Sequence, residues 1–273
     1  MRIETFDRVE YEHNPLAEVV CQVLFERLEA LSDESVAQFK AAFEELGYSQ
    51  TEQITMSFGL PPVAQVANGP GLVAVPAGWP QVRLDHFASA DGIWKVSISA
   101  EFIALTCSKY TGWTEFLPRM LVAAQMFSKR CPGTVPLRLG LRYKDVVERE
   151  PLGLGNTPWN RLIKPFLLGP LAPDALADGQ TAADQDVENF LSQSLLKLDN
   201  SMVLLQSSLL RSIDGARRAF MIDADFYNLG ELESDLLGND DLLAARLHAL
   251  HEHAGALFRR GITETLHHAL RPR

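Results

Sequence analysis

The sequence predicts an α+β protein in which an antiparallel sheet is covered by helices on one face. Short runs alternate apolar with polar residues, which is typical of strands with one buried face. Asp91-Gly92 and Asp214-Gly215 each separate two such runs, and glycine accepts the positive φ that tight hairpin turns require. Strands and helices do not alternate regularly along the chain, which argues against a parallel doubly wound sheet.

The first half of the chain is expected to follow roughly the order β-α-β-β-β-α. Residues 15–28 alternate as a strand, and residues 36–46 carry apolar side chains at helical spacing before Gly47, a stop signal. Residues 59–80 hold five prolines and four glycines, so an irregular excursion is expected there. The other predicted elements are strands at 54–58, 82–87, 94–99 and 102–107 and a helix at 113–129.

The second half is expected to have a similar order. Its predicted elements are a strand at 137–143, a short helix at 159–168, an acidic loop at 169–188, hairpin strands at 202–211 and 218–226, and a long helix at 240–270. Residues 98–102 follow the first Asp-Gly turn much as residues 222–226 follow the second. This predicts an internal duplication, with halves 1–131 and 132–273 packed as one unit. The alternative is that two ordinary hairpins share a common turn.

Composition excludes several classes of protein. The 273 residues include 35 Asp+Glu and 25 Lys+Arg, a net charge of −10, and 47% are hydrophobic. A disordered chain would have fewer apolar residues, and a general nucleic-acid-coating protein would have a basic surface. The chain has no apolar run near the ~18–20 residues of a membrane span and no secretory signal pattern at its start. We therefore expect a cytoplasmic protein.

The cysteines carry no metal or disulfide signature. Cys21, Cys107 and Cys131 are odd in number and far apart, so they form no CxxC pair. This spacing fits reduced thiols that pack as small buried hydrophobic residues. The sequence likewise contains no glycine-rich phosphate loop and no GxSxG nucleophile motif. No cofactor and no metal ion are predicted.

Histidines gather in the last predicted helix and are the first candidates for catalysis. His248, His251 and Glu252 lie at i, i+3 and i+4, so they share one helical side and are placed for proton transfer or metal ligation. The order His-Ala-Leu-His-Glu-His matches neither HExxH nor HxxEH. The alternative, which we favour, is that His251 borders the buried stripe and is hydrogen-bonded to a neighbour.

Charged residues on the predicted strands are the second set of candidates. Asp223 and Asp225 lie two apart on one strand, so they share a face and could divide acid and base roles. Arg138, Arg142 and Arg218 could form a cationic surface for a phosphate, a carboxylate or an acidic partner if their strands are neighbours. The alternative is ordinary cross-strand pairing between these arginines and aspartates, which we favour.

Four segments resemble, in order, an uncharacterised bacterial family known as "sporadically distributed protein". They are Asn14-Pro-Leu-Ala-Glu-Val-Val-Cys-Gln-Val-Leu-Phe25, Tyr110-Thr-Gly-Trp-Thr-Glu-Phe116, Gly140-Leu-Arg-Tyr143 and the stretch from Leu247 to Thr263. The chain departs from the family at Leu16, where a second proline is usual, and at Lys144-Asp145, where Ile-Asn is usual. The resemblance supplies no reaction, cofactor or catalytic residue. The family's patchy distribution suggests horizontally transferred genes, as in defence or mobile cassettes.

The leading functional prediction is a non-enzymatic binding or adaptor protein that engages a protein or a small anionic ligand. It would use the arginine-bearing sheet face or the loops at 59–80 and 169–190. One alternative is a hydrolase- or transferase-like enzyme that uses His248, His251 and Glu252 with the Asp223/Asp225 pair. Another is a self-associating structural component in which the last helix forms a homodimer. A membrane partner is not expected, and nucleic acid is expected nowhere except on the arginine face.

Overall fold

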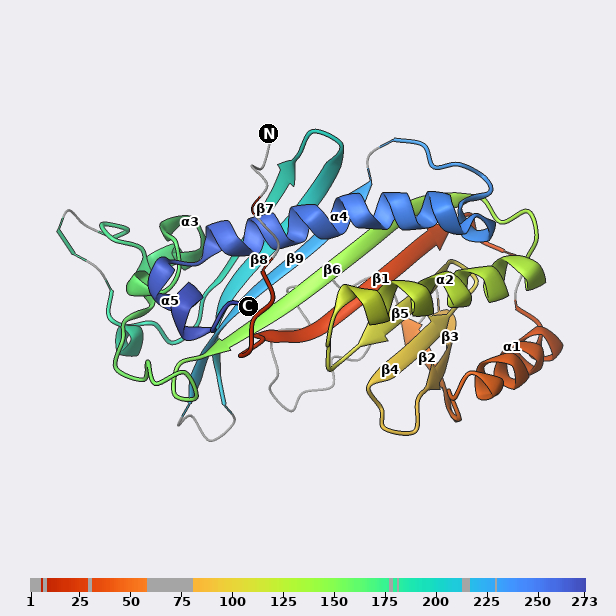
Figure 1. Ribbon diagram of the computed structural model, residues 1–273, viewed down its shortest axis with the longest axis horizontal. Helices are drawn as coiled ribbons and strands as arrows, with labels where there is room; N and C mark the ends of the chain where they lie inside the picture. Colours follow the sequence, from red (N-terminus) through yellow and green to blue (C-terminus); the bar gives the residue numbers. More distant parts are fainter. Residues whose placement is uncertain are drawn as a thin grey trace.

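The computed structural model describes residues 6, 9–28, 31–57, 81–176, 179–180, 182–212, 217–228 and 230–273. Within these ranges the chain is a mixed α/β protein with one nine-stranded sheet and five α-helices (Figure 1). Every neighbouring pair of strands is antiparallel. The predicted antiparallel sheet is therefore confirmed. The predicted excursion at 59–80 and the second Asp-Gly turn at 214–215 lie outside the described residues.

Most strand predictions are confirmed within a few residues. The strands are β1 (Leu16–Phe25), β2 (Gln50–Ser57), β3 (Gln81–Ala88), β4 (Trp94–Ile98), β5 (Phe102–Cys107), β6 (Pro136–Glu148), β7 (Leu191–Lys197), β8 (Ser201–Arg211) and β9 (Arg218–Asn228). The first Asp-Gly turn joins β3 to β4, with Gly92 at φ 71° and the Asp91 carboxylate accepting from the Ile93 N–H. Strand β7, which begins just after the predicted acidic loop, was not predicted.

The helices are α1 (Asp33–Glu45), α2 (Trp113–Arg130), α3 (Pro165–Leu168), α4 (Asp240–Gly261) and α5 (Glu264–Ala269). The prediction of one helix over 240–270 is wrong beyond Gly261. Ile262 is extended and forms a bridge with Ile163, and the Thr263 side chain then caps the start of α5. The predicted helix at 159–168 is also divided, into the 3₁₀ turn η2 (Trp159–Arg161) and the short α3.

The strand order is β2-β3-β4-β5-β1-β6-β9-β8-β7, which places β1 and β6 together at the centre. Helices α2 and α4 lie side by side across one face of this sheet, as predicted, and α1 lies beside α2 near one edge (Figure 1). Helix α4 packs on β6 and β9, and α2 packs on β5. Fully burying one large apolar side chain between such layers stabilises the fold by about 1.5–3 kcal/mol. The largest fully buried side chains are Trp159, Phe39, Phe43, Phe116, Phe127, Phe220 and Phe226.

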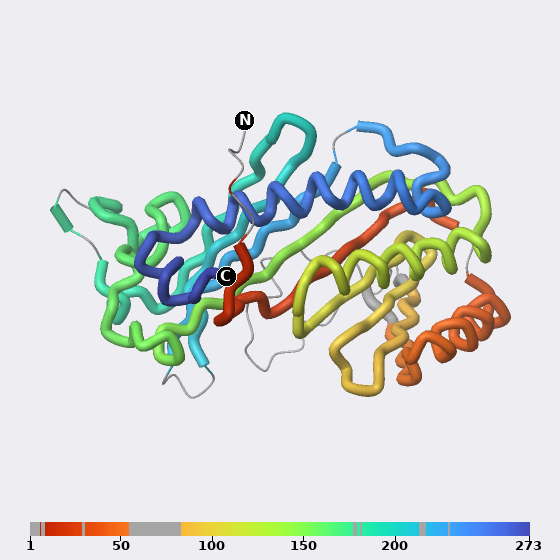
Figure 2. Tube along the Cα trace, in the orientation of Figure 1, coloured from red at the N-terminus to blue at the C-terminus, as the bar shows by residue number. Residues whose placement is uncertain are grey.

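The described segment that leads into β1 lies beside the end of the chain. Tyr11 and Pro272 form an isolated antiparallel bridge, and the Glu12 N–H donates to the Arg271 carbonyl over 3.0 Å. Figure 2 shows the red segment before β1 passing next to the C-terminus. The segment before β1 and the segment after α5 are therefore hydrogen-bonded to each other near the α4–α5 end of the helical layer.

Candidate functional site

The histidines of α4 are packed and hydrogen-bonded. Trp113 Nε1 donates to His248 Nδ1 over 3.0 Å, and the His251 ring stacks on Trp113 with centroids 4.1 Å apart and an interplanar angle of 6°. The Tyr143 hydroxyl lies 2.6 Å from His251 Nδ1, whereas Glu252 is exposed. This is the structural alternative that the sequence left open. Within the described ranges, no group of three or more His, Cys, Asp or Glu side chains is arranged to hold a metal ion.

The same cluster joins the four segments that carry the family resemblance. The Tyr110 ring contacts both Phe116 of α2 and Tyr143 of β6, and Trp113 stacks on Phe116. Asn14 Nδ2 donates to the Tyr110 carbonyl over 3.3 Å. Packing between α2, α4 and β6 therefore explains why these residue types occur at these spacings.

The arginines and aspartates of β6 and β9 neutralise one another on the sheet face away from α4. Asp223 and Asp225 alternate with buried apolar residues of β9, so they point to that opposite face. Arg142 Nε donates to Asp223 Oδ1 over 2.7 Å, and Arg138 Nη2 donates to Asp225 Oδ2 over 2.7 Å. Burial raises the pKa of Asp225, and the adjacent Arg138 opposes that rise. Each carboxylate is held by an arginine, as the cross-strand alternative predicts.

Arg218 is separated from this pair and lies in a row of three arginines. It is opposite Arg211 across the β8–β9 ladder. The β6–β9 ladder ends at Glu148 opposite Ala219, and Arg149 and Arg218 are the next residues of the two segments beyond that pair. Like charges in such positions repel. Arg149 is paired with Asp184 at 2.5 Å and Arg211 with Glu188 at 3.0 Å, whereas among the described residues no carboxylate pairs with Arg218.

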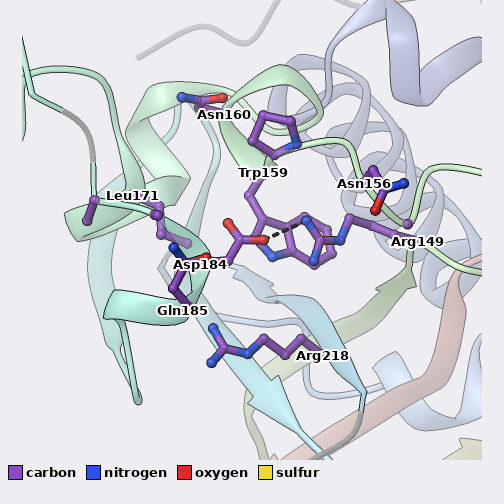
Figure 3. Close-up of a pocket in the computed structure, with 12 residues that line it drawn as sticks. Arg149, Asn156, Trp159, Asn160, Leu171, Asp184, Gln185 and Arg218 are labelled. Carbon is purple, nitrogen blue, oxygen red and sulfur yellow. Dashed lines mark hydrogen bonds and ion pairs between the residues drawn. The ribbon is translucent and has the colours of Figure 1, made fainter.

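Arg149 and Arg218 line a pocket of about 420 Å³, which we call the arginine pocket (Figure 3). Its other walls come from residues 155–160, which include the start of η2, from Leu171, and from residues 182–185, where the 3₁₀ turn η4 (Asp184–Asp186) begins. Figure 3 shows the Arg149 guanidinium lying over the Trp159 indole, with Asp184 in front and Arg218 on the other side of the pocket. Part of the predicted 169–190 loop and one predicted arginine therefore meet at one site.

The floor of the arginine pocket is built on a buried tryptophan. Trp159 is 0% exposed, and the Arg149 Cζ lies 4.4 Å from the centroid of its ring, a cation–π contact. The Arg149 side chain is only 9% exposed and also donates from Nη1 to the Thr157 carbonyl over 2.7 Å. These contacts fix the Arg149 guanidinium and leave its Nε–H as a donor without a partner in the described chain.

Four buried polar atoms of this pocket have no hydrogen-bond partner within the described chain. Three are donors, at Arg149 Nε, Trp159 Nε1 and Arg218 Nη1, and the fourth is the acceptor Asn160 Oδ1. Buried polar groups in folded proteins are nearly always hydrogen-bonded, because leaving one unmade costs about 1–3 kcal/mol. All four atoms belong to residues that line the arginine pocket, which makes it the strongest candidate for a ligand site in the described part of the chain.

A second pocket, of about 510 Å³, is less suited to binding. It lies between the end of α1, the β3–β4 turn and the start of α2. Two of its charged side chains already contact each other: Arg119 donates to Glu115 over 3.2 Å, and the Arg119 Cζ lies 4.5 Å from the Trp94 ring centroid. None of the buried atoms without a partner in the described chain belongs to a residue that lines it.

No protein-family model matches the chain, and no curated protein matches it in sequence. The resemblance to the sporadically distributed family therefore stays a prediction. In the part of the chain that the structure describes, no helix combines the length and apolar character needed to cross a bilayer.

Proposed function

We propose that this protein binds a small anionic ligand in the arginine pocket and does not transform it chemically. The observation that carries the proposal is that three residues lining one pocket, Arg149, Trp159 and Arg218, each have a buried N–H donor without a partner in the described chain. An anion there would accept charge-assisted hydrogen bonds, which are about twice as strong as neutral ones. It would also offset the repulsion between the adjacent arginines of the row.

Binding without catalysis fits the residues that line the pocket. They include no His, Cys, Ser, Thr, Tyr, Lys or Glu, and the single carboxylate, on Asp184, is held by Arg149. The enzyme alternative has less support. It needs the α4 histidines to act with Asp223 and Asp225, but these aspartates point to the sheet face opposite α4.

Titration calorimetry and thermal unfolding with small carboxylates and phosphates, at constant ionic strength, test the proposal. We expect Arg218→Gln to weaken binding roughly tenfold or more, because a hydrogen bond to a charged group contributes about 1.5–3 kcal/mol. Arg217→Gln is the matched control, since it removes the same charge from an exposed neighbour that does not line the pocket. If no anion binds the wild type, or if the control loses as much affinity, the proposal is wrong.

Self-association through the last helix has less support. Leu257, an apolar residue of that helix, is buried in the core of the protein. A Leu257→Asp variant would therefore unfold the protein whether or not a homodimer exists. The molar mass of the wild type in solution, measured by light scattering, tests for a homodimer. The mass of a dimer would support the self-association alternative. An adaptor role, in which the arginine pocket binds a protein partner, stays a prediction.

We also infer that the two halves arose by duplication. Outward from the central pair, β1 is followed by β5, β4 and β3, and β6 by β9, β8 and β7; helices α2 and α4 follow β5 and β9 on the same face. The two Asp-Gly turns are not equivalent in this order, because one joins β3 to β4 and the other separates β8 from β9. Superposing residues 16–130 on 136–261 tests the inference, and strands that fail to coincide in this order would refute it.

We propose a cytoplasmic location on the basis of the thiols. All three cysteines are free, and Cys21 and Cys107 are buried within the sheet. Free thiols persist in reducing compartments, whereas oxidising ones favour disulfides. Fractionation of the producing cells tests this, and recovery of the protein outside the cytoplasm would refute it.

A further inference from the structure

The chemistry of the arginine pocket narrows the class of anion. We infer that the ligand is a monocarboxylate with a hydrogen-bond donor, an amide N–H or a hydroxyl, close to its carboxylate. This inference rests on the proposed function and adds the substrate class. Three features of the pocket support it: its net charge, its hydrogen-bonded loop and its single free acceptor.

The net charge of the pocket matches one negative charge on the ligand. Arg149 and Arg218 supply two positive charges and Asp184 removes one, while the third arginine of the row, Arg211, is paired with Glu188. A carboxylate carries one negative charge and would be balanced. A phosphate monoester carries about −1.5 to −2 near neutral pH, so part of its charge would be left without compensation in a half-enclosed site.

Several backbone N–H groups of the loop beside the pocket are already used. A phosphate-binding loop presents several free backbone N–H groups to the ligand. Here the N–H groups of Leu152 and Leu154 both donate to the Arg149 carbonyl, and that of Gly153 donates to the Glu150 carbonyl. The Thr157 N–H is also used, by the Leu154 carbonyl. These four N–H groups are therefore not available to a phosphate, and the unpartnered side-chain donors of the pocket are those of Arg149, Trp159 and Arg218.

The free hydrogen-bonding atoms match a carboxylate with an adjacent donor. The two oxygens of a carboxylate offer about four acceptor sites, enough for the N–H groups of Arg149, Trp159 and Arg218. The oxygen of Asn160 has no donor in the described chain, so it can accept from an N–H or O–H of the ligand. A pocket of about 420 Å³ also exceeds the needs of acetate and falls in the range for small organic ligands.

An N-acylated amino acid or a 2-hydroxy acid has this chemistry, as does the C-terminal residue of a peptide. Calorimetry with matched probes distinguishes these from other anions: N-acetyl-L-alanine, L-lactate, acetate, N-acetyl-L-alanine amide and glycerol phosphate. We expect N-acetyl-L-alanine or lactate to bind at least tenfold more tightly than acetate or glycerol phosphate, and the neutral amide not to bind. A tripeptide ending in alanine that binds more tightly still would identify a peptide C-terminus as the source.

Asn160→Leu supplies a second readout, because it removes the acceptor at a partly exposed position. We expect it to lower the affinity for N-acetyl-L-alanine at least fivefold and to leave that for acetate unchanged, with circular dichroism confirming the fold. Tighter binding of glycerol phosphate than of any carboxylate would overturn the inference and leave the proposed function standing. Equal affinity for acetate and N-acetyl-L-alanine would refute the adjacent donor. Binding of no probe would refute both proposals.

Discussion

Gly140 lies in the middle of β6, and replacing it with alanine has a consequence that depends on a second residue. An alanine Cβ at this position would lie 2.5 Å from Arg138 Nη1 and 3.2 Å from its Cζ. The arginine is flexible at that end, so it can move, but its guanidinium would then leave Asp225 and the face of Tyr227, 4.2 Å from the ring centroid. The cost of Gly140→Ala is therefore the loss of the contacts that Arg138 makes.

The magnitude follows from those contacts. The Arg138 and Asp225 side chains are 23% and 27% exposed, so their ion pair contributes about 0.5–1 kcal/mol. The contact with Tyr227 adds about 0.5–1 kcal/mol. Alanine recovers about 0.5–1 kcal/mol in a strand, because glycine loses more backbone entropy on folding. Gly140→Ala should thus lower the free energy of unfolding by about 0.5–1 kcal/mol in the wild type, and raise it by a similar amount when Arg138 is already alanine.

Urea unfolding of the wild type, both single variants and the double variant measures this reversal of sign. Gly255→Ala is the control: Gly255 lies in the interior of α4, is exposed and has open space where a Cβ would be, so alanine there should stabilise both backgrounds equally. Equal destabilisation by Gly140→Ala with and without Arg138 would refute the reasoning, because it would place the cost in the backbone or the packing instead.

Two buried groups give further predictions. Burial raises the pKa of Asp145 to about 8, far above about 3.9 in an unfolded chain, so its contribution to stability is present below pH ~4 and is lost as the pH rises towards 8. In urea unfolding at a series of pH values, the free energy of unfolding of the wild type should fall by up to about 1.4 kcal/mol per pH unit between pH 4 and 8 because of this group, and Asp145→Asn should remove that fall. The same dependence on pH in the variant and the wild type would contradict this. Cys21 is fully buried, which raises its pKa, so a maleimide should modify it more slowly than the half-buried Cys131; equal rates by mass spectrometry would show that the sheet opens readily.

The sequence predicted strands well where one face is buried and poorly where neither is. Strand β1 alternates cleanly because Val19, Cys21, Val23 and Phe25 all face the helical layer. Strand β7 is the edge of the sheet and mostly exposed, so the segment Leu191–Lys197 has no apolar alternation to detect. The break at Ile262 depends on its bridge to Ile163, a contact with a residue about a hundred positions away that no local pattern contains.

The candidate site was predicted in part for a similar reason. Arg138 and Arg142 were correctly placed near Asp223 and Asp225, because all four residues lie at alternating positions of neighbouring strands. Arg218 was wrongly grouped with them. Arg218 lies two and four positions before Phe220 and Ile222 on β9, so its side chain projects from the same face as theirs and from the face opposite Asp223 and Asp225. That separation follows from strand periodicity and could have been inferred from the sequence.

The rest of the arginine pocket has no local sequence signature. Arg149, Trp159 and Asp184 come from three separate segments, and only the folded chain brings them together. The register between β6 and β9 determines both the arginine–aspartate pairs of the sheet and the position of this pocket. Within the ladder, arginines of β6 lie near aspartates of β9 and charge is balanced. The next residues beyond its last pair are Arg149 and Arg218, and of these two only Arg149 has a carboxylate partner in the described chain. The same strand pairing that neutralises the centre of the sheet thus leaves one positive charge at its end, where an anion can bind.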